Sequence, residues 1–545
     1  MINAAQVVIT AFLLTAAAAA ASTQIVPDKS ISNSMKAHIT FLADDALEGR
    51  KPGEKGYKIA ARYVASQFSA LGLAPVGDNS SFYQHVPLSR AGLTAAKPSI
   101  RINGQRLDGD NEDIMIGPSV TAAHEIVEGE AVFVGYGIDA PQHGLNDYAG
   151  LDLRGKVAVF LNGFPGDLPG ATGAHLALQK TAAARRRGAV ATIELETSAS
   201  LKRRPWRLIK ETFSRPITTW VNEQGEASPA PSANRATARL TGSASEMLFE
   251  KAQKSFASIL AEADQLGGKP RGFPLGAAVR IERTSAMRTL TSENIVAMLP
   301  GSDVRLSKES VLLTAHLDHI GVMEQRTDDP IYNGAMDNAA GIAALIEIAR
   351  LLAEAPTPPK RSVVFAALTA EEDGMVGSHY LANHPIRPDG ERIVAVLNFD
   401  MPILLFDFTD IIALGAAHST LELAVNRAAA QMRLRHVPDP SPAEGHFTRS
   451  DHYRFVEKGV PALSIRTAEK TRGSPISATF LREHYHQPSD DPGLPFNWVA
   501  AARYAQISAL ITQMVADADV SPRWYADSPF GQAFAPNSEK SNPQN

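Results

Sequence analysis

Histidine and carboxylate side chains recur at the ends of short apolar segments in the C-terminal half of the chain. The side chains that could do chemistry there are His316, Asp318, His319, Asp337, Glu371, Glu372, Asp400 and His486. In an open α/β sheet, the groups that follow the strands collect along one edge of the sheet. A cluster of carboxylates without cations would repel itself. The pattern therefore predicts a metal site.

The composition restricts the kind of metal site. The chain has 545 residues and no cysteine, which excludes thiol catalysis, disulfides and Cys-ligated zinc or iron–sulfur centres. Histidine and carboxylate ligands suit zinc, cobalt or manganese, and one carboxylate can bridge two such ions about 3.5–4 Å apart. A carboxylate near a ligating histidine can orient its ring. Of two adjacent glutamates, one can bind a metal while the other acts as a general base.

Near-continuous apolar runs precede these side chains and predict the strands that position them. Such runs are typical of strands that helices cover on both faces. A helical pattern over 338–352 lies between two of the runs, as the crossover of a βαβ unit requires. The predicted fold class is α/β, a three-layer mixed sheet with helices on both faces. The predicted strands are 294–299, 310–315, 362–368, 393–398 and 461–465.

The rest of the chain divides into segments where the periodicity of its apolar residues and its composition change. Apolar residues recur every three or four positions over 36–73, which predicts amphipathic helices. Short valine-containing runs over 120–285 predict a small β-rich domain. The basic stretch 201–208 is interpreted as a solvated face. The expected divisions are 23–119, 120–285 and 286–520, followed by a flexible polar tail at 521–545.

The net charge indicates which partners to expect, and the N-terminal segment indicates where the protein is located. The chain has 53 Lys and Arg against 58 Asp and Glu, a formal net charge of −5, which argues against nucleic acid as a partner. Residues 7–21 are apolar and end in small residues, which predicts a signal peptide over 1–22. A short N-terminal membrane anchor is the alternative, although the segment is below the ~20 apolar residues that span a bilayer comfortably. We expect an exported protein, periplasmic or secreted, with no stable membrane span after cleavage.

Five motif blocks over 295–515 resemble the co-catalytic di-zinc aminopeptidases. This family includes bacterial leucyl aminopeptidases and, more distantly, glutamate carboxypeptidase. The resemblance implies a phosphorylase/hydrolase-like fold, with 36–78 as the N-terminal part of the peptidase domain and 120–285 as an inserted protease-associated domain. Ser450-Asp451-His452 matches a family motif near the substrate pocket. The five blocks are His316-Leu-Asp318-His319, Gly334-Ala-Met-Asp337-Asn338-Ala-Ala-Gly341, Ala370-Glu371-Glu372-Asp-Gly374, Asn398-Phe-Asp400 and Tyr485-His486-Gln-Pro-Ser-Asp490.

The resemblance also implies the roles of the site residues. It implies two zinc ions held by five side chains, one of which both ions share. Glu371 would be the general base, and Asp318 the partner of His316. The implied ligands are His316 and Asp400 for one ion, Glu372 and His486 for the other, and Asp337 as the bridge.

The function that follows from the resemblance is removal of N-terminal residues from peptides by a metal-bridging water that Glu371 activates. A di-zinc carboxypeptidase or dipeptidase is an alternative that would need basic residues to hold a terminal carboxylate. A non-catalytic peptide-binding or receptor module is the alternative of another class, and it predicts damaged ligands, whereas all five are intact. A metallo-β-lactamase-type site would need a histidine where Thr314 stands. A glutaminyl cyclase-like transferase typically lacks the pair formed by Glu371 and Glu372.

Overall fold

The computed structural model describes most of the chain after the N-terminal segment. Among these residues, no helix is both long and apolar enough to cross a membrane. The predicted signal peptide over 1–22 lies outside the described residues. The structure describes residues 29–213, 215–228, 237–324, 326–386, 391–469 and 474–543.

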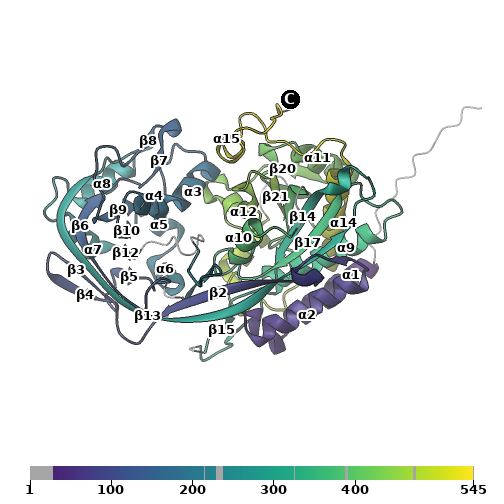
Figure 1. The fold of residues 1–545 in the computed structure, drawn as a ribbon, viewed down its shortest axis with the longest axis horizontal. Helices are drawn as coiled ribbons and strands as arrows, with labels where there is room; N and C mark the ends of the chain where they lie inside the picture. The colour runs from purple at the N-terminus through teal and green to yellow at the C-terminus, as the bar shows by residue number, and fades with distance from the viewer. Residues whose placement is uncertain are drawn as a thin grey trace, which may run out of the picture.

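A mixed sheet is the centre of the unit that carries the predicted site (Figure 1). Four neighbouring strands, β17, β14, β18 and β21, run parallel, and the outer strands add antiparallel pairs. All seven residues of β17 are buried, because helices cover both faces of the sheet. Across the sheet the strands are β11 (Ile217–Trp220), β2 (Tyr83–Leu93), β13 (Phe273–Leu299), β17 (Ser362–Leu368), β14 (Glu309–His316), β18 (Arg392–Asn398), β21 (Ala462–Ala468), β19 (Asp410–Leu414) and β20 (Arg435–Val437).

Helices form the two outer layers of this unit. One face of the sheet shares a large apolar core with α1, α2, α9, α11 and α14, and the other face shares a core with α10 and α12. The prediction of an α/β fold with helices on both faces of a mixed sheet is therefore confirmed. The helices are α1 (Lys29–Leu42), α2 (Lys55–Ala70), α9 (Ala340–Ala353), α10 (Val376–Asn383), α11 (Leu421–Gln431), α12 (Tyr453–Val456), α13 (Pro475–Glu483) and α14 (Trp498–Asp517).

A second unit has its own sheet and its own core (Figure 1). Strands β6, β9, β10 and β12 run parallel, and antiparallel strands flank them. Its strands are β3 (Ser99–Ile102), β4 (Gln105–Asp108), β5 (Ile114–Ile116), β6 (His124–Phe133), β9 (Val157–Leu161), β10 (Ala191–Leu195), β12 (Ala238–Leu240) and the first part of β13. Its helices are α3 (Gly170–Leu178), α4 (Lys180–Arg186), α5 (Ser198–Arg203), α6 (Trp206–Phe213), α7 (Gly242–Phe249) and α8 (Phe256–Ala263).

The second unit begins earlier in the chain than predicted. We expected it to start at residue 120, but β3 and β4 already pair within its sheet. Asn103 and Gly104 join these two strands with φ values of 51° and 90°, as an Asn-Gly hairpin turn requires. The long strand β13 belongs to both sheets, pairing with β3 and β6 up to Thr284 and with β2 from Ser285 onward. The strand therefore passes from one sheet to the other between Thr284 and Ser285.

The C-terminal segment packs against the fold, in contrast to the flexible tail expected at 521–545. Trp524, Tyr525 and Phe530 are each about 1% exposed. The Trp524 indole N–H donates to the Gly459 carbonyl oxygen at 2.8 Å, and the short helix α15 (Pro529–Phe534) follows. The segment is rich in polar residues, but Trp524 and Phe530 pack in the same apolar core as residues of α12. Composition alone therefore gave the wrong expectation for residues 521–543.

Trp524→Ala is expected to destabilise the protein by about 3–5 kcal/mol, because it removes a buried aromatic side chain and leaves a cavity. Urea unfolding followed by circular dichroism checks this. Val520→Ala is the matched control, since Val520 is 58% exposed and its truncation is expected to change stability by less than ~0.5 kcal/mol. Equal unfolding midpoints for the two variants would contradict the packing described here.

Candidate metal centre and active site

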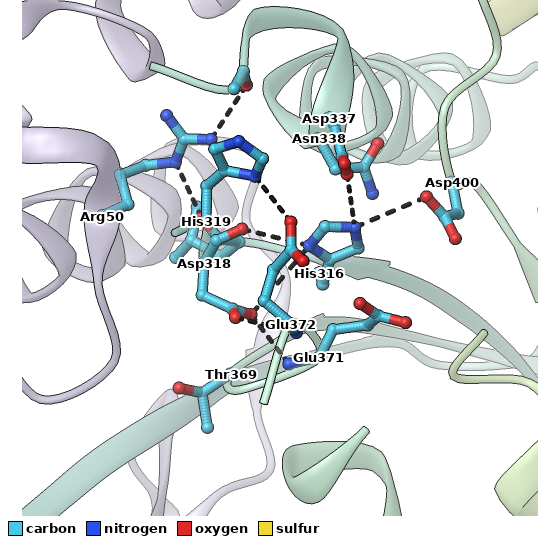
Figure 2. Close-up of polar contacts among 12 residues, drawn as sticks. Arg50, His316, Asp318, His319, Asp337, Asn338, Thr369, Glu371, Glu372 and Asp400 are labelled. Carbon is cyan, nitrogen blue, oxygen red and sulfur yellow. Dashed lines mark hydrogen bonds and ion pairs between the residues drawn. The ribbon is translucent and has the colours of Figure 1, made fainter. Parts of the chain in front are cut away.

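The carboxyl ends of three parallel strands bring the predicted site residues together (Figure 2). His316 is the last residue of β14, and Asp400 lies two residues after β18. Glu371 and Glu372 follow β17 by a few residues. Because these strands are parallel and adjacent, their ends meet at one edge of the sheet.

His316 lies between two carboxylates. Its Nε2 atom is 3.2 Å from Asp337 Oδ1 and 3.4 Å from Asp400 Oδ1. His316 is 1% exposed, Asp337 3% and Asp400 7%. Ligand atoms of these three side chains come close enough together to hold one metal ion.

A second group of ligand atoms forms on the other oxygen of Asp337. His486 Nε2 is 3.3 Å from Asp337 Oδ2 and 3.0 Å from Glu372 Oε2. On the far side of Glu372, His319 Nδ1 is 2.7 Å from Oε1. Atoms of His319, Asp337 and Glu372 are also close enough together to hold one ion. The two groups therefore share Asp337, the residue predicted as the bridge.

The protonation of these side chains follows from their mutual contacts. Burial by itself lowers the pKa of His316, but the carboxylates of Asp337 and Asp400 outweigh it and raise that pKa well above its ordinary value. Burial also opposes protonation of His486, whereas Glu372 and Asp337 raise its pKa to about 9. Burial would raise the pKa of Asp337, and the two histidines lower it instead. The carboxylates thus favour the protonated, positively charged forms of His316 and His486.

The donor set fits divalent cations. His319 Nδ1 and Glu372 Oε1 are buried and 2.7 Å apart, yet neither has a hydrogen-bond partner among the described residues. Burial lowers the pKa of His319, which leaves a neutral imidazole with a lone pair to donate. Imidazole nitrogens and carboxylate oxygens are ligands that zinc accepts. A cation that displaced the protons of His316 and His486 would balance the same carboxylates.

Asp318 contacts three neighbouring residues, His316, Glu371 and Glu372. Its backbone oxygen is 3.1 Å from His316 Nδ1, whereas its carboxylate is 4.0 Å from that atom. The carboxylate instead accepts the backbone N–H groups of Glu371 and Glu372 at 3.1 and 3.3 Å. Asp318 therefore contacts His316 mainly through its main chain and fixes the turn that carries both glutamates. Burial raises its pKa to about 8.

Glu371 extends toward His316 and Asp400 (Figure 2). Its carboxylate accepts no hydrogen bond from the part of the chain that the structure describes, and it is partly exposed. Burial of the surrounding site, together with the charges of Asp451, Asp400 and Glu372, raises the pKa of Glu371 well above its ordinary value. A carboxylate in this setting can accept a proton from a water molecule beside the metal ligands.

Asp490 and Arg50 hold the loop that carries Asp337. The Asp490 carboxylate accepts the backbone N–H groups of Met336 at 2.8 Å and of Asp337 at 3.0 Å. The buried Arg50 guanidinium donates hydrogen bonds to the backbone oxygen of Leu317 at 2.8 Å and to that of Gly334 at 2.9 Å. Both residues fix the backbone on which the bridging carboxylate sits.

Gly334 begins this loop and must be glycine. Its φ is 60°, and a Cβ atom there would lie 2.2 Å from the Asp337 carbonyl oxygen and 2.6 Å from the His319 ring. Asn338 closes the loop, because its side-chain oxygen accepts the backbone N–H of Gly341 at 3.1 Å. Its amide group donates to the Phe399 carbonyl oxygen at 3.0 Å, which connects the loop to the turn before Asp400.

The structure brings all seven predicted site residues into one cluster and adds others. His319, Asp490 and Arg50 had no predicted role, although His319 and Asp490 lie inside motif blocks and Arg50 lies within the segment 36–73. His319 stands one residue after Asp318, and Asp490 four residues after His486. The signal was thus present as an ionisable residue within a motif block, but only the fold shows which neighbour each one contacts.

Two relatives with similar sequences are named as aminopeptidases. Over 142 residues the chain is 29% identical to "Aminopeptidase NAALADL1" of Mus musculus, covering 25% of this chain and 17% of that protein. Over 238 residues it is 24% identical to "Aminopeptidase YwaD" of Bacillus subtilis (strain 168), covering 43% and 47%. The matches thus span less than half the length of either relative.

The fold and the motif region have known counterparts. The solved "Aminopeptidase from Aneurinibacillus sp. strain AM-1" superposes with a TM-score of 0.51 at 19% identity, covering 90% of this chain and 95% of that one, so the two share a fold. The model of peptidase family M28 matches residues 294–512, which contain all five motif blocks. This match agrees with the resemblance stated from those blocks: residues 294–512 are similar to peptidase family M28.

Proposed function

We propose that the protein is a zinc-dependent aminopeptidase, an exopeptidase that hydrolyses N-terminal residues from peptides. One observation carries the proposal: two groups of histidine and carboxylate ligand atoms meet at Asp337, one at each of its carboxylate oxygens. The aminopeptidase names of the relatives and the M28 match support the same activity.

We propose two zinc ions. His316, Asp337 and Asp400 would hold one of them, and Glu372, His486 and Asp337 the other. His319 contacts Glu372 and is a further candidate ligand for the second ion. When bound, the ions supply Lewis acidity that polarises the scissile carbonyl group and makes a water molecule more acidic.

The residues of this chain supply the proton transfers. Glu371 accepts a proton from the attacking water and returns it to the leaving amine, as a general base and then a general acid. Asp318 holds the backbone of Glu371 and thereby the position of its carboxylate. The ionised carboxylates around the site would also hold the α-ammonium group of a substrate, which favours cleavage at a free N-terminus.

Metal analysis and hydrolysis, measured together, test this function. The purified protein is assayed for zinc per chain and tested on peptides with a free amine, on N-blocked peptides and on peptides with a C-terminal reporter. We expect about two zinc ions, cleavage of free-amine substrates only, and loss of turnover on chelation. Cleavage of N-blocked peptides at the C-terminal bond would instead identify a carboxypeptidase. No metal and no turnover would leave a peptide-binding module.

We also propose that the protein is exported, to the periplasm or the medium. The apolar segment 7–21, followed by small residues near Ala20 and Ser22, supports this. N-terminal sequencing of the protein recovered from a producing cell tests it. A mature N-terminus close to Ser22 is expected, and a full-length chain retained in the cytoplasm would contradict export.

A further inference from the structure

One strand of the peptidase sheet comes from the part of the chain that otherwise forms the second unit. After α6 the chain enters the peptidase sheet as β11 and then continues to β12 in the second unit. β11 pairs antiparallel with β2, and this pairing places Thr218 opposite Arg90. On the other side of β2, Arg90 lies opposite Arg288 of β13. Arg90 therefore stands where β11 is attached to the sheet.

Arg90 connects β11 to the turn that carries the two glutamates. It is 4% exposed. Its Nε atom donates to the Thr218 hydroxyl at 3.0 Å, and its Nη2 atom donates to Asp373 Oδ2 at 3.1 Å and to the Pro52 carbonyl oxygen at 3.2 Å. Asp373 lies two residues after Glu371. A charge-assisted hydrogen bond from a buried guanidinium thus holds a side chain close to the proposed general base.

The turn has a conformation that its surroundings must maintain. Ala370 and Met375, at its two ends, have φ values of 55° and 60°, which are unfavourable for residues other than glycine. Between them, the Glu371 carbonyl oxygen accepts the backbone N–H groups of Gly374 at 2.7 Å and of Met375 at 2.8 Å. Asp318 holds the N–H groups at the start of the turn, and the ion pair described above holds its second half.

A second contact from β11 reaches the same segment. Trp220 lies two residues after Thr218, and its indole N–H donates to His379 Nδ1 at 2.8 Å. Burial lowers the pKa of His379 to about 4, so its imidazole is neutral and can accept this bond. The Trp220 ring also packs against an apolar cluster that contains Ala370 and Val376, which flank the turn. Residues of β11 therefore contact both flanks of the turn and, through the guanidinium, its middle.

We propose that β11 and Arg90 position the catalytic base. Arg90 is a positioning residue that acts on Glu371 through Asp373, and Thr218 orients the Arg90 guanidinium from the strand. The segment that forms the second unit thereby contributes to the geometry of the active site, in addition to building its own sheet. The inference rests on the proposed peptidase function and on the role of Glu371 within it.

Asp373→Asn removes the charge of the anchored side chain and keeps its shape. We expect kcat to fall about tenfold, because a small displacement of a catalytic group is costly, while KM stays within about twofold and the zinc content is unchanged. Arg90→Met is expected to lower kcat by a similar factor, and Arg90→Lys, which keeps the positive charge, is expected to restore part of it. Loss of zinc, or a change in KM alone, would contradict a positioning role.

Arg288→Met is the matched control for Arg90→Met. Arg288 lies opposite Arg90 on the neighbouring strand, but its side chain is 57% exposed and pairs with Glu54. Its kcat is expected to stay within about twofold of the wild type. An equal loss of kcat in the two variants would show that any change of charge in this part of the sheet is harmful, and would overturn the inference.

Thr218→Val tests whether β11 acts through Arg90. The change keeps the shape of the side chain and removes the oxygen that accepts from Arg90 Nε, so we expect kcat to fall about threefold. In the Asp373→Asn protein the same change is expected to have no further effect, since the guanidinium is already released from the turn. A threefold reduction in both backgrounds would show that Thr218 acts independently of the pair formed by Arg90 and Asp373, and would overturn the inference.

Amide hydrogen exchange reads the turn without turnover and separates this inference from the proposed function. Backbone N–H groups over 371–377 are hydrogen-bonded within the turn or to Asp318, so their exchange reports its opening. A peptide covering 371–377 is compared with one covering β14, in the wild type and in Asp373→Asn. At least tenfold faster exchange confined to the turn supports the positioning even if the wild-type protein hydrolyses nothing. Unchanged exchange in the turn, or equal acceleration in both segments, would overturn it even if the wild-type protein is an active aminopeptidase.

Discussion

Glu371→Gln is expected to lower kcat by about 10³–10⁴ while the protein still binds its metal. The glutamine has nearly the same shape but cannot accept a proton, so the change removes general-base catalysis, which contributes about 10²–10⁴, and the return of the proton to the leaving amine. The Glu371 carboxylate contacts none of the metal-ligand atoms at ion-pair distance in the described structure, whereas Glu372 contacts both His319 and His486. The two adjacent glutamates therefore separate into a base and a ligand.

The measurement pairs single-turnover kinetics with metal analysis of the same sample. Glu324→Gln is the matched control, because Glu324 is exposed and lies outside the cluster, so its kcat is expected to stay within about twofold of the wild type. Loss of zinc from the Glu371→Gln protein would show that Glu371 is a ligand. Retention of full turnover would show that another group takes the proton.

The strands and the side chains that follow them could be predicted from the sequence because both are local properties. Runs such as 362–368 are apolar at every position, which is what burial on both faces produces. Since parallel strands end at a common edge, the residues after them had to meet. His316, Glu372 and Asp400 therefore came together as expected.

The supporting contacts could not be predicted, because they join segments far apart in the sequence. Arg50 donates to backbone oxygens near residue 317 and near residue 334, and neither spacing nor composition shows such a contact. Asp490 looks in sequence like the end of a loop motif, yet its two oxygens hold the backbone of Met336 and Asp337. A carboxylate that positions a backbone and one that binds a metal have the same sequence signature.

The division into units failed for a similar reason. The expected start at residue 120 followed a change in composition, whereas the true start follows strand pairing with β13, nearly 180 residues away. The basic stretch 201–208 was interpreted from its charge alone, and the charge of Tyr485, which acts on Arg204 within it, comes from a segment far away in the sequence. Local pattern predicted which elements form, and the tertiary contacts decided what each one faces.

Asp337→Asn is expected to remove both zinc ions and to lower kcat/KM by more than 10³. One oxygen of Asp337 is 3.2 Å from His316 and the other is 3.3 Å from His486, so its carboxylate belongs to both ligand groups. The amide keeps the shape but loses the charge and one acceptor oxygen, and it therefore weakens both positions at once. A change confined to one group should be less severe: Asp400→Asn leaves Glu372, His486 and Asp337 in place and is expected to keep one ion.

Zinc content after dialysis against a weak chelator measures this difference. The expected order is two ions for the wild type and for Asp328→Asn, one for Asp400→Asn, and none for Asp337→Asn. Asp328 is the matched control because it is exposed and pairs only with Arg326 at the surface, where an ion pair contributes little. If Asp337→Asn and Asp400→Asn each lost a single ion, Asp337 would serve one position only. The two short distances from Asp337 to His316 and His486 would then be ion pairs between side chains, and Asp337 would not bridge two metal ions.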